Sequence, residues 1–221
     1  MNFYYFEALV ISFSKIFMNK YTGSFWDERY SDNNFVYGTD PNEFFKEQLD
    51  LLKPGKILML GEGEGRNGVY AAQKGWLVNA VDLSVKAKEK ALTLAKRKNV
   101  NINYAVDDLQ NYEPKKDFYD AAGLIFLHLN EKIRDKVHKK VISSLKANGT
   151  VIMEVYSKEQ LERSSGGPQN LNMLYSIENI KETFSDLIPI ILTKEIINLS
   201  ESHFHYGEAS VIRFIGKKKS L

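Results

Sequence analysis

The sequence predicts an α/β domain with a mostly parallel β-sheet, helices on both faces, and an antiparallel pair of strands near the end of the chain. Three observations lead to this fold. Short apolar runs alternate with amphipathic helical patterns from residue 40 onward. A glycine-rich turn, "GEGEG" at 61–65, joins the first of these runs to a helix. After residue 157 the alternation stops, and two long strand-like runs follow without a helix between them.

The first helix is expected in "DPNEFFKEQLDLL", residues 40–52. Asp40 can cap its free amides, Pro41 suits the first helical position, and Glu43 would complete a capping box. The next three elements, a strand, a helix and a strand joined by short turns, form a unit that implies parallel pairing. They are expected at 57–60, 66–74 and 77–81.

The later elements follow from cap and stop signals. Ser84 can cap the next helix, and Asn148 with Gly149 would end the helix before the fifth strand. Five strand–helix repeats and a closing antiparallel strand pair predict a seven-stranded sheet. The expected strands are 102–106, 119–126 and 150–156, then the pair near 189–198 and 208–215, with helices at 85–98, 131–146 and 176–185.

Composition narrows the function. The chain has 221 residues, 43% hydrophobic content and a net charge of +2, which is ordinary for one globular domain and does not indicate a nucleic-acid partner. Without cysteine there is no disulfide, thiolate metal site or thiol nucleophile, and an intracellular, cytoplasmic location is expected. The apolar opening carries Glu7 and Lys15 and lacks a basic leader, so neither a signal peptide nor a membrane partner is expected.

The start of the chain is expected to stand apart from the rest. Met18 begins "MNKYTGSFWDERY", which is a plausible native start, so the residues before it could be an extension or a short amphipathic helix. We therefore expect an N-terminal extension at 1–24 and a single domain at 25–221.

The glycine turn raises the question of which nucleotide it holds. A dinucleotide fingerprint needs a third glycine where Arg66 stands, whereas Asp82 ends the second strand, where a carboxylate can accept both ribose hydroxyls. A further acidic pair, Asp107 and Asp108, ends the third strand. Each of these residues could instead serve a turn or a cap. Their positions at the carboxyl ends of consecutive strands, where open α/β sheets bind ligands, favour a cofactor site.

With these motifs, several further segments resemble the class I S-adenosylmethionine-dependent methyltransferases, and more narrowly the tellurite-resistance (TehB-like) and thiopurine-methyltransferase-like branch. The resemblance runs from residue 25 to 216. It implies a Rossmann-like fold and S-adenosyl-L-methionine as the cofactor. The matching segments are "FWDERYSDNNFVYGTDPNEFF", "GEGEGRNGVYAAQKG", "VD" at 81–82, "DDL" at 107–109, "FLHL" at 126–129, "SGGP" at 165–168 and "HYGEASVIR" at 205–213.

The resemblance also implies roles for single residues. The three glycines would let the backbone approach the methionine and ribose, Asp82 would bind the ribose, and Asp108 with the Leu109 amide would contact adenine. The family usually carries an acid two residues before the first glycine, where Met59 stands here, so Glu62 is the alternative partner for the cofactor's ammonium. The candidate cofactor residues are Trp26, Tyr30, Gly61, Glu62, Gly63, Gly65, Asp82, Leu83, Asp108 and Leu109.

Methyl transfer from a sulfonium is an in-line displacement, so the protein must chiefly align the acceptor and exclude water. The resemblance implies that the segment around Trp26, Tyr30 and Tyr37 folds over the cofactor as a lid, although these aromatic residues could instead simply pack on the sheet. Candidate catalytic residues are His128 and His205, each of which could instead be a structural histidine. Candidate substrate-binding residues are Tyr37, Arg66, Tyr156 and Arg163.

Glu201, His203 and His205 alternate, which on one strand would place all three on one face. This pattern suggests a metal site, but no cluster of further ligands is evident, so we expect no metal and favour polar lining of the acceptor pocket, mainly through His205.

The leading hypothesis is a methyltransferase acting on a small acceptor such as tellurite, selenite or a thiol, as a monomer or homodimer without a nucleic-acid partner. An NAD-dependent oxidoreductase would share the glycine turn and Asp82 but should continue its parallel sheet to the end of the chain. A non-catalytic protein that binds S-adenosylmethionine is the third possibility.

Overall fold

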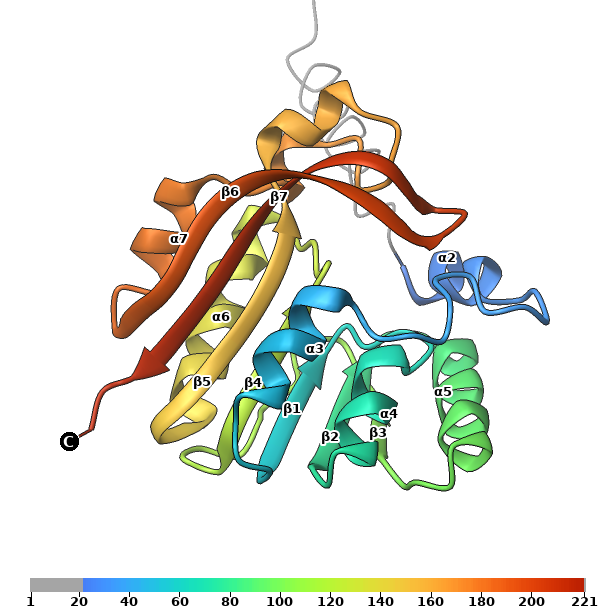
Figure 1. The fold of residues 1–221 in the computed structure, drawn as a ribbon, viewed down its shortest axis with the longest axis horizontal. Coiled ribbons are helices and arrows are strands. Elements are labelled where there is room, and N and C mark those ends of the chain that lie inside the picture. The colour runs from blue at the N-terminus through green and yellow to red at the C-terminus, as the bar shows by residue number, and fades with distance from the viewer. Residues whose placement is uncertain (1–21, 221) are drawn as a thin grey trace, which may run out of the picture.

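The computed structural model describes residues 22–220, which form a seven-stranded sheet in the order β3-β2-β1-β4-β5-β7-β6 (Figure 1). Strands β1 to β5 run parallel, and β7 pairs antiparallel with both β5 and β6. The mostly parallel sheet and its closing antiparallel pair are therefore confirmed. The strands are β1 Lys56–Leu60, β2 Leu77–Asp82, β3 Asn103–Val106, β4 Tyr119–Ile125, β5 Leu145–Tyr156, β6 Leu187–Ser202 and β7 His205–Lys218.

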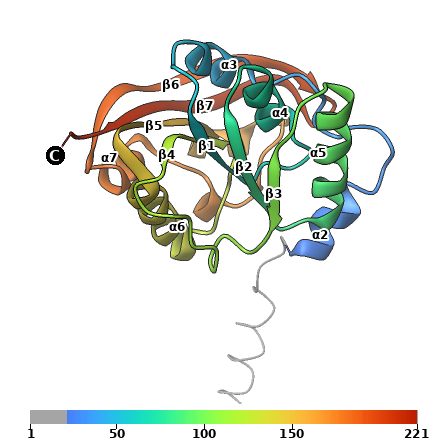
Figure 2. The ribbon, with the colours of Figure 1, turned by 90° about the horizontal axis from the view of Figure 1, so that it is seen from below.

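Helices cover both faces of this sheet (Figure 2). One face packs against α3, α4 and α5 through side chains such as Phe45, Val69 and Leu94, and the other packs against α6 and α7 through Val137 and Ile180. These two apolar layers bury the sheet between them. The helices are α2 Gly23–Arg29, α3 Glu43–Asp50, α4 Arg66–Gln73, α5 Val85–Arg97, α6 Glu131–Ser144 and α7 Ile177–Thr183, with short 3₁₀ turns at Lys158–Glu162 and Leu171–Met173.

Two local predictions need correction. Helix α3 begins at Glu43 and is capped by Asn42, whose Oδ1 accepts from the Phe45 amide at 2.9 Å, so the expected cap at Asp40 and the first position at Pro41 were wrong by two residues. The closing strands are also longer than predicted and meet in a tight hairpin, Ser202 pairing with His205. In contrast, Ser84 caps α5 as predicted, its Oγ accepting from the Ala87 amide.

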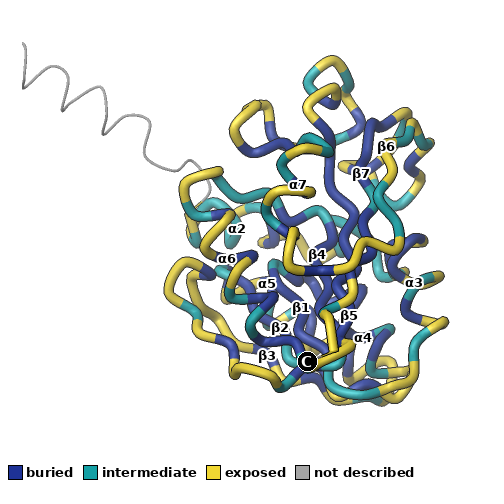
Figure 3. Tube along the Cα trace, turned by 90° about the vertical axis from the view of Figure 1, so that its left-hand side faces the viewer, coloured by how far each residue is buried: buried dark blue, intermediate teal, exposed yellow. Residues whose placement is uncertain are grey.

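The edge strand and the central strands differ in burial. Strand β6 is exposed along much of its length, whereas β7 and β5 are buried over most of theirs (Figure 3). Within residues 22–220, none of the helices has the length and apolar character needed to cross a bilayer. Most of the expected extension at 1–24 lies outside the described residues.

Parallel pairing brings the sequence motifs to one edge of the sheet. Leu60 lies opposite Val81 and Asp82 lies opposite Val106, so β1, β2 and β3 end together. The turn 61–65 and Asp82 therefore share the carboxyl edge.

A column of stacked rings lies beneath this edge on the α6 side. His138 of α6 is buried between the rings of Tyr175 and Phe184, with centroid distances of 6.0 and 4.8 Å. Its Nδ1 has no hydrogen-bond partner among the described residues. Burial lowers the pKa of His138 to about 3, and the charge of Arg134 acts in the same direction.

This histidine should make the fold sensitive to acid. The unfolded chain protonates near pH 6.5 while the folded chain stays neutral, so the stabilisation is full above that pH and is lost as the pH falls toward the folded pKa. Between pH 7 and pH 5, the free energy of unfolding should fall by about 2 kcal/mol less in His138→Gln than in the wild type. Urea unfolding at both pH values measures this. His203→Gln, an exposed change in the hairpin turn, is the control, and an unaltered pH dependence in His138→Gln would contradict the assignment.

Candidate active site

The glycine turn after β1 is built on left-handed backbone. Gly61, Gly63 and Gly65 have φ values of +61°, +60° and +93°, a region that other residues rarely adopt. A Cβ on Gly65 would lie 2.7 Å from Cβ of Ala91, and one on Gly63 would lie 2.9 Å from the Tyr30 hydroxyl. The turn therefore needs glycine and lets neighbouring groups approach its backbone.

Asp82, at the end of β2, fixes this turn. Its Oδ2 accepts from the Gly63 amide at 3.0 Å, and its Oδ1 accepts from the Ser84 amide at 3.0 Å. Burial raises the pKa of the carboxyl, although both amides act to lower it. Each oxygen keeps a second lone pair, so Asp82 holds the turn and can still accept a further hydrogen bond.

Glu62 lies inside the turn, and Met59 does not reach it. Burial raises the pKa of Glu62 to about 8, although the Gly68 amide donates to its Oε1. The Met59 side chain instead packs in the core beside Gly123 and Phe45. Glu62 is thus a buried acidic group that the turn supplies at this edge.

The turn after β3 lies beside the end of β2. The Asp107 amide donates to the Asp82 carbonyl at 3.0 Å. The Asp108 side chain is exposed and accepts from the Gln110 amide at 2.9 Å, while Leu109 is buried. Asp108 therefore has a local turn role and remains open to solvent.

The predicted lid residues do lie over the glycine turn. Tyr30 is buried above Gly63, stacks on Trp26 at 5.7 Å and meets Tyr37 edge-on at 6.1 Å. Asp27 docks α2 on the start of α5, its Oδ1 accepting from the Ser84 hydroxyl and the Lys86 amide. Gly23 packs against Leu83.

Glu64, which the sequence analysis did not single out, fastens the segment that follows α2. Its two oxygens accept from the amides of Val36 and Tyr37, both at 3.1 Å, and it pairs with Lys90 at 2.6 Å. Lys90 also donates to the carbonyls of Asp32 and Asn34. The position of Glu64 between two glycines of the turn could have drawn attention to it. Its partners Val36 and Tyr37 lie 28 and 27 positions away, so the spacing of residues does not predict these contacts.

Tyr37, Arg66, Tyr156 and His205 come together at the same edge. The His205 ring lies 4.9 Å from Tyr37 and 5.8 Å from Tyr156, measured between centroids. Burial lowers the pKa of His205, while its hydrogen bond to Glu201 opposes that shift. Four of the predicted acceptor-side residues thus converge.

Glu201 is the centre of this group. Its Oε2 accepts from Arg66 Nη2 at 2.9 Å and from His205 Nδ1 at 3.0 Å, and its Oε1 accepts from Asn42 Nδ2 at 2.8 Å. Burial acts to raise the pKa of Glu201, but His205 and Arg66 lower it to about 2. The expectation that Glu201, His203 and His205 share one face of a strand was wrong, because a hairpin turn separates Glu201 on β6 from His205 on β7 and leaves His203 exposed.

Asn42 connects this centre to the buried carboxylate of Glu154. Its Nδ2 also donates to Oε1 of Glu154 at 2.7 Å, and its backbone amide donates to Asn67 Oδ1. Glu154 is fully buried and pairs through Oε2 with Arg213 at 2.6 Å. Both hydrogens of one amide group therefore bridge two carboxylates.

His128 and Arg163 lie in different surroundings. His128 Nδ1 donates to the Met173 carbonyl at 3.0 Å while Nε2 accepts from the Tyr156 amide at 3.3 Å, and burial lowers its pKa to about 4. Arg163 pairs with Glu208 at 3.2 Å instead of joining the Glu201 group. Within residues 22–220 no three histidine or acidic side chains are arranged to hold a metal ion.

Comparison with known proteins gives one match to a family model. Residues 57–149 match the model described as a methyltransferase domain. This part of the chain is therefore similar to a methyltransferase domain. The glycine turn, the buried Asp82 and the acidic Glu62 fit S-adenosyl-L-methionine, because that group presents ribose hydroxyls and an ammonium.

Similar proteins share this fold at low identity. An uncharacterized protein of Methanocaldococcus jannaschii is 24% identical over 187 residues, which are 80% of this chain but only 38% of that protein. TehB of Haemophilus influenzae has a TM-score of 0.66 and 16% identity, over 89% of this chain and 67% of that one. Phosphoethanolamine N-methyltransferase 2 of Haemonchus contortus, solved with S-adenosyl-L-methionine, has a TM-score of 0.61 and 20% identity, over 92% of this chain and 59% of that one.

The bridging role of Asn42 can be separated from its capping role. Asp and Asn are comparable helix caps, so a pure cap would tolerate Asn42→Asp. A third carboxylate between Glu154 and Glu201 should instead destabilise the fold by about 2 to 4 kcal/mol in denaturant unfolding. Asn130→Asp, at the cap of α6, is the matched control and should be nearly neutral. Equal stability of the two variants would show that Asn42 only caps.

Glu64→Gln should loosen the lid. A Gln side chain keeps one acceptor but turns an NH₂ group toward the other amide and loses the charge pairing with Lys90. We expect the amide hydrogens of Val36 and Tyr37 to exchange at least about tenfold faster, the loss of one net hydrogen bond. Glu89→Gln, which breaks an exposed pair with Lys86, is the control. Unchanged protection at both amides would rule out Glu64 as their anchor.

Proposed function

We propose that the methyltransferase domain transfers a methyl group from S-adenosyl-L-methionine to a small-molecule acceptor. The observation that carries this proposal is the bond between the Gly63 amide and the buried Asp82 carboxylate, which joins the turn after β1 to the end of β2. A carboxylate held there suits two ribose hydroxyls, and the open backbone beside it suits the methionine portion.

The cofactor side would use the residues around this bond. Glu62 would receive the ammonium, and Asp108 with the Leu109 amide would contact adenine. Trp26 and Tyr30 offer aromatic faces, which attract a cation in a water-excluded site. The remaining proposed cofactor residues are Gly61, Gly63, Gly65, Asp82 and Leu83.

The cofactor supplies an electrophilic methyl group on a cationic sulfur, so the protein needs no nucleophile of its own. Its residues would align the acceptor and exclude water. Tyr37, fastened through its amide to Glu64, would close the site. Tyr156 and His205 would line it, and His128 would hold the Tyr156 backbone in place.

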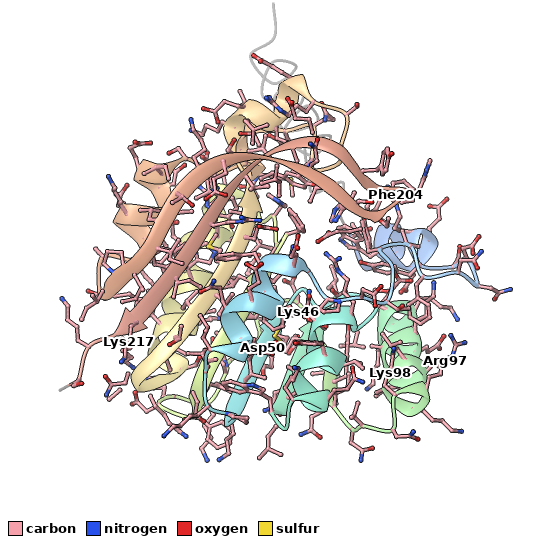
Figure 4. All side chains as sticks on the ribbon, in the orientation of Figure 1. Lys46, Asp50, Arg97, Lys98, Phe204 and Lys217 are labelled. Carbon is pink, nitrogen blue, oxygen red and sulfur yellow. The ribbon has the colours of Figure 1, made fainter. Side chains whose placement is uncertain are left out.

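The enclosure of Tyr37, Tyr156 and His205 favours a small acceptor. The lid meets the β6–β7 hairpin where Arg29 lies over the Phe204 ring at 4.4 Å, and Figure 4 shows Phe204 at the hairpin tip near α2. Gly38 packs against the Glu201 carbonyl. Tellurite and selenite remain candidate acceptors, supported by the fold shared with TehB. Arg163 remains a predicted substrate residue, and a monomer or homodimer remains the expected assembly.

Calorimetry can test the proposal. The protein should bind S-adenosyl-L-methionine and S-adenosyl-L-homocysteine at micromolar concentration and should not bind NAD. Asp82→Ala should weaken both by about 1 to 3 kcal/mol, because the ribose hydroxyls lose their acceptor. Asp120→Ala removes a carboxylate that likewise accepts a backbone amide, at the opposite end of the sheet, and should leave the affinity unchanged. Binding of NAD alone would refute the proposed function.

A further inference from the structure

We infer that the methyl acceptor carries an anionic group, a carboxylate or an oxyanion, and that the guanidinium of Arg66 binds it. This inference rests on the proposed function, because it assigns the substrate class of the same site.

Arg66 uses only part of its hydrogen-bonding capacity within the protein. It is the first residue of α4, only 7% exposed, and its Nη2 donates to one oxygen of Glu201. A guanidinium usually meets a carboxylate through two parallel bonds. Here the other Glu201 oxygen accepts from Asn42, so the pair has a single bond. Nη1 of Arg66 is buried and has no partner among residues 22–220.

The neighbouring carboxylates have other partners. Glu154 pairs with Arg213, and Glu64 pairs with Lys90. Asp82 accepts two backbone amides, and Glu62 accepts the Gly68 amide. A buried donor without a partner is unfavourable, and an arginine donor prefers an anionic oxygen. A ligand oxygen would therefore supply the acceptor that Nη1 of Arg66 lacks.

The contacts of Glu201 connect Arg66 to the acceptor side. One oxygen of Glu201 accepts from both Arg66 Nη2 and His205 Nδ1. The His205 ring lies 4.9 Å from the Tyr37 ring and 5.8 Å from the Tyr156 ring, measured between centroids. The Phe126 ring lies 4.5 Å from the His205 ring, so aromatic surface adjoins the histidine that shares Glu201 with Arg66. An anionic head with a compact apolar or inorganic body matches these groups.

Glu201 affects both the orientation and the charge of the Arg66 guanidinium. Because its carboxylate stays ionised and bonds Nη2, it fixes the direction of the guanidinium and offsets part of its charge. A lysine at position 66 could keep the ion pair with Glu201 but would lack the second arm of the fork. Arg66→Lys therefore tests whether anion binding needs only a positive charge or also the two arms of the guanidinium.

The test measures binding to the full-length protein saturated with S-adenosyl-L-homocysteine. Calorimetric titrations would use benzoate, selenite and the neutral benzamide, with the wild type, Arg66→Gln and Arg66→Lys. Arg97→Gln removes an exposed arginine on α5 (Figure 4) and is the matched control. Thermal unfolding checks each variant, and Arg66→Lys keeps a cation beside Glu201 if Arg66→Gln fails to fold.

We expect wild type and Arg97→Gln to bind at least one anion, and benzoate at least tenfold more tightly than benzamide if the carboxylate is the ligand. Arg66→Gln and Arg66→Lys should lose at least tenfold in anion affinity while binding S-adenosyl-L-homocysteine within about threefold of wild type. Binding of benzoate alone identifies a carboxylate acceptor, and binding of selenite alone identifies an inorganic oxyanion. Equal anion affinity in the Arg66 variants, or no anion binding by a wild type that binds S-adenosyl-L-homocysteine, would overturn the inference. A wild type that fails to bind S-adenosyl-L-homocysteine would overturn the proposed function and this inference with it.

Discussion

The proposed acceptor side of this protein depends on one partly buried carboxylate, that of Glu201. Three donors meet it, from Asn42 before α3, Arg66 at the start of α4 and His205 on β7. Burying a carboxylate is costly unless its oxygens are paired, so these contacts must form together. The same interactions that stabilise the charge therefore hold three distant segments in one arrangement.

The proposed cofactor side is organised by local geometry instead. Asp82 lies only a few residues from Ser84, and parallel pairing places it beside the turn after β1. These relations follow from strand direction and from the turn chemistry of glycine, both of which are visible in the sequence. This is why the strands, the turn and the position of Asp82 could be predicted.

The contacts that could not be predicted share a different property. Glu64 is fastened to amides 27 and 28 positions away, and Arg66 meets Glu201 across 135 positions. No periodicity encodes such contacts. The start of α3 was predicted at Asp40 for a related reason: local preference allows several caps, but Asn42 also bridges Glu154 and Glu201, and this tertiary demand decides between them. The alternation of Glu201, His203 and His205 likewise suggested one strand, but the chain turns between Glu201 and His205 and forms a hairpin.

The position of the β6–β7 hairpin affects how this protein can diversify. Its tip carries Glu201 and His205 to the acceptor side, while Asp82 and the glycine turn belong to segments that end well before it. The hairpin lies at the sheet edge, with β6 as its outermost strand. Changes in length or sequence at the tip can therefore reshape one half of the site without disturbing the parallel strands. Under the proposed function, selection for a new acceptor would act on a part of the fold that is separate from the proposed cofactor side.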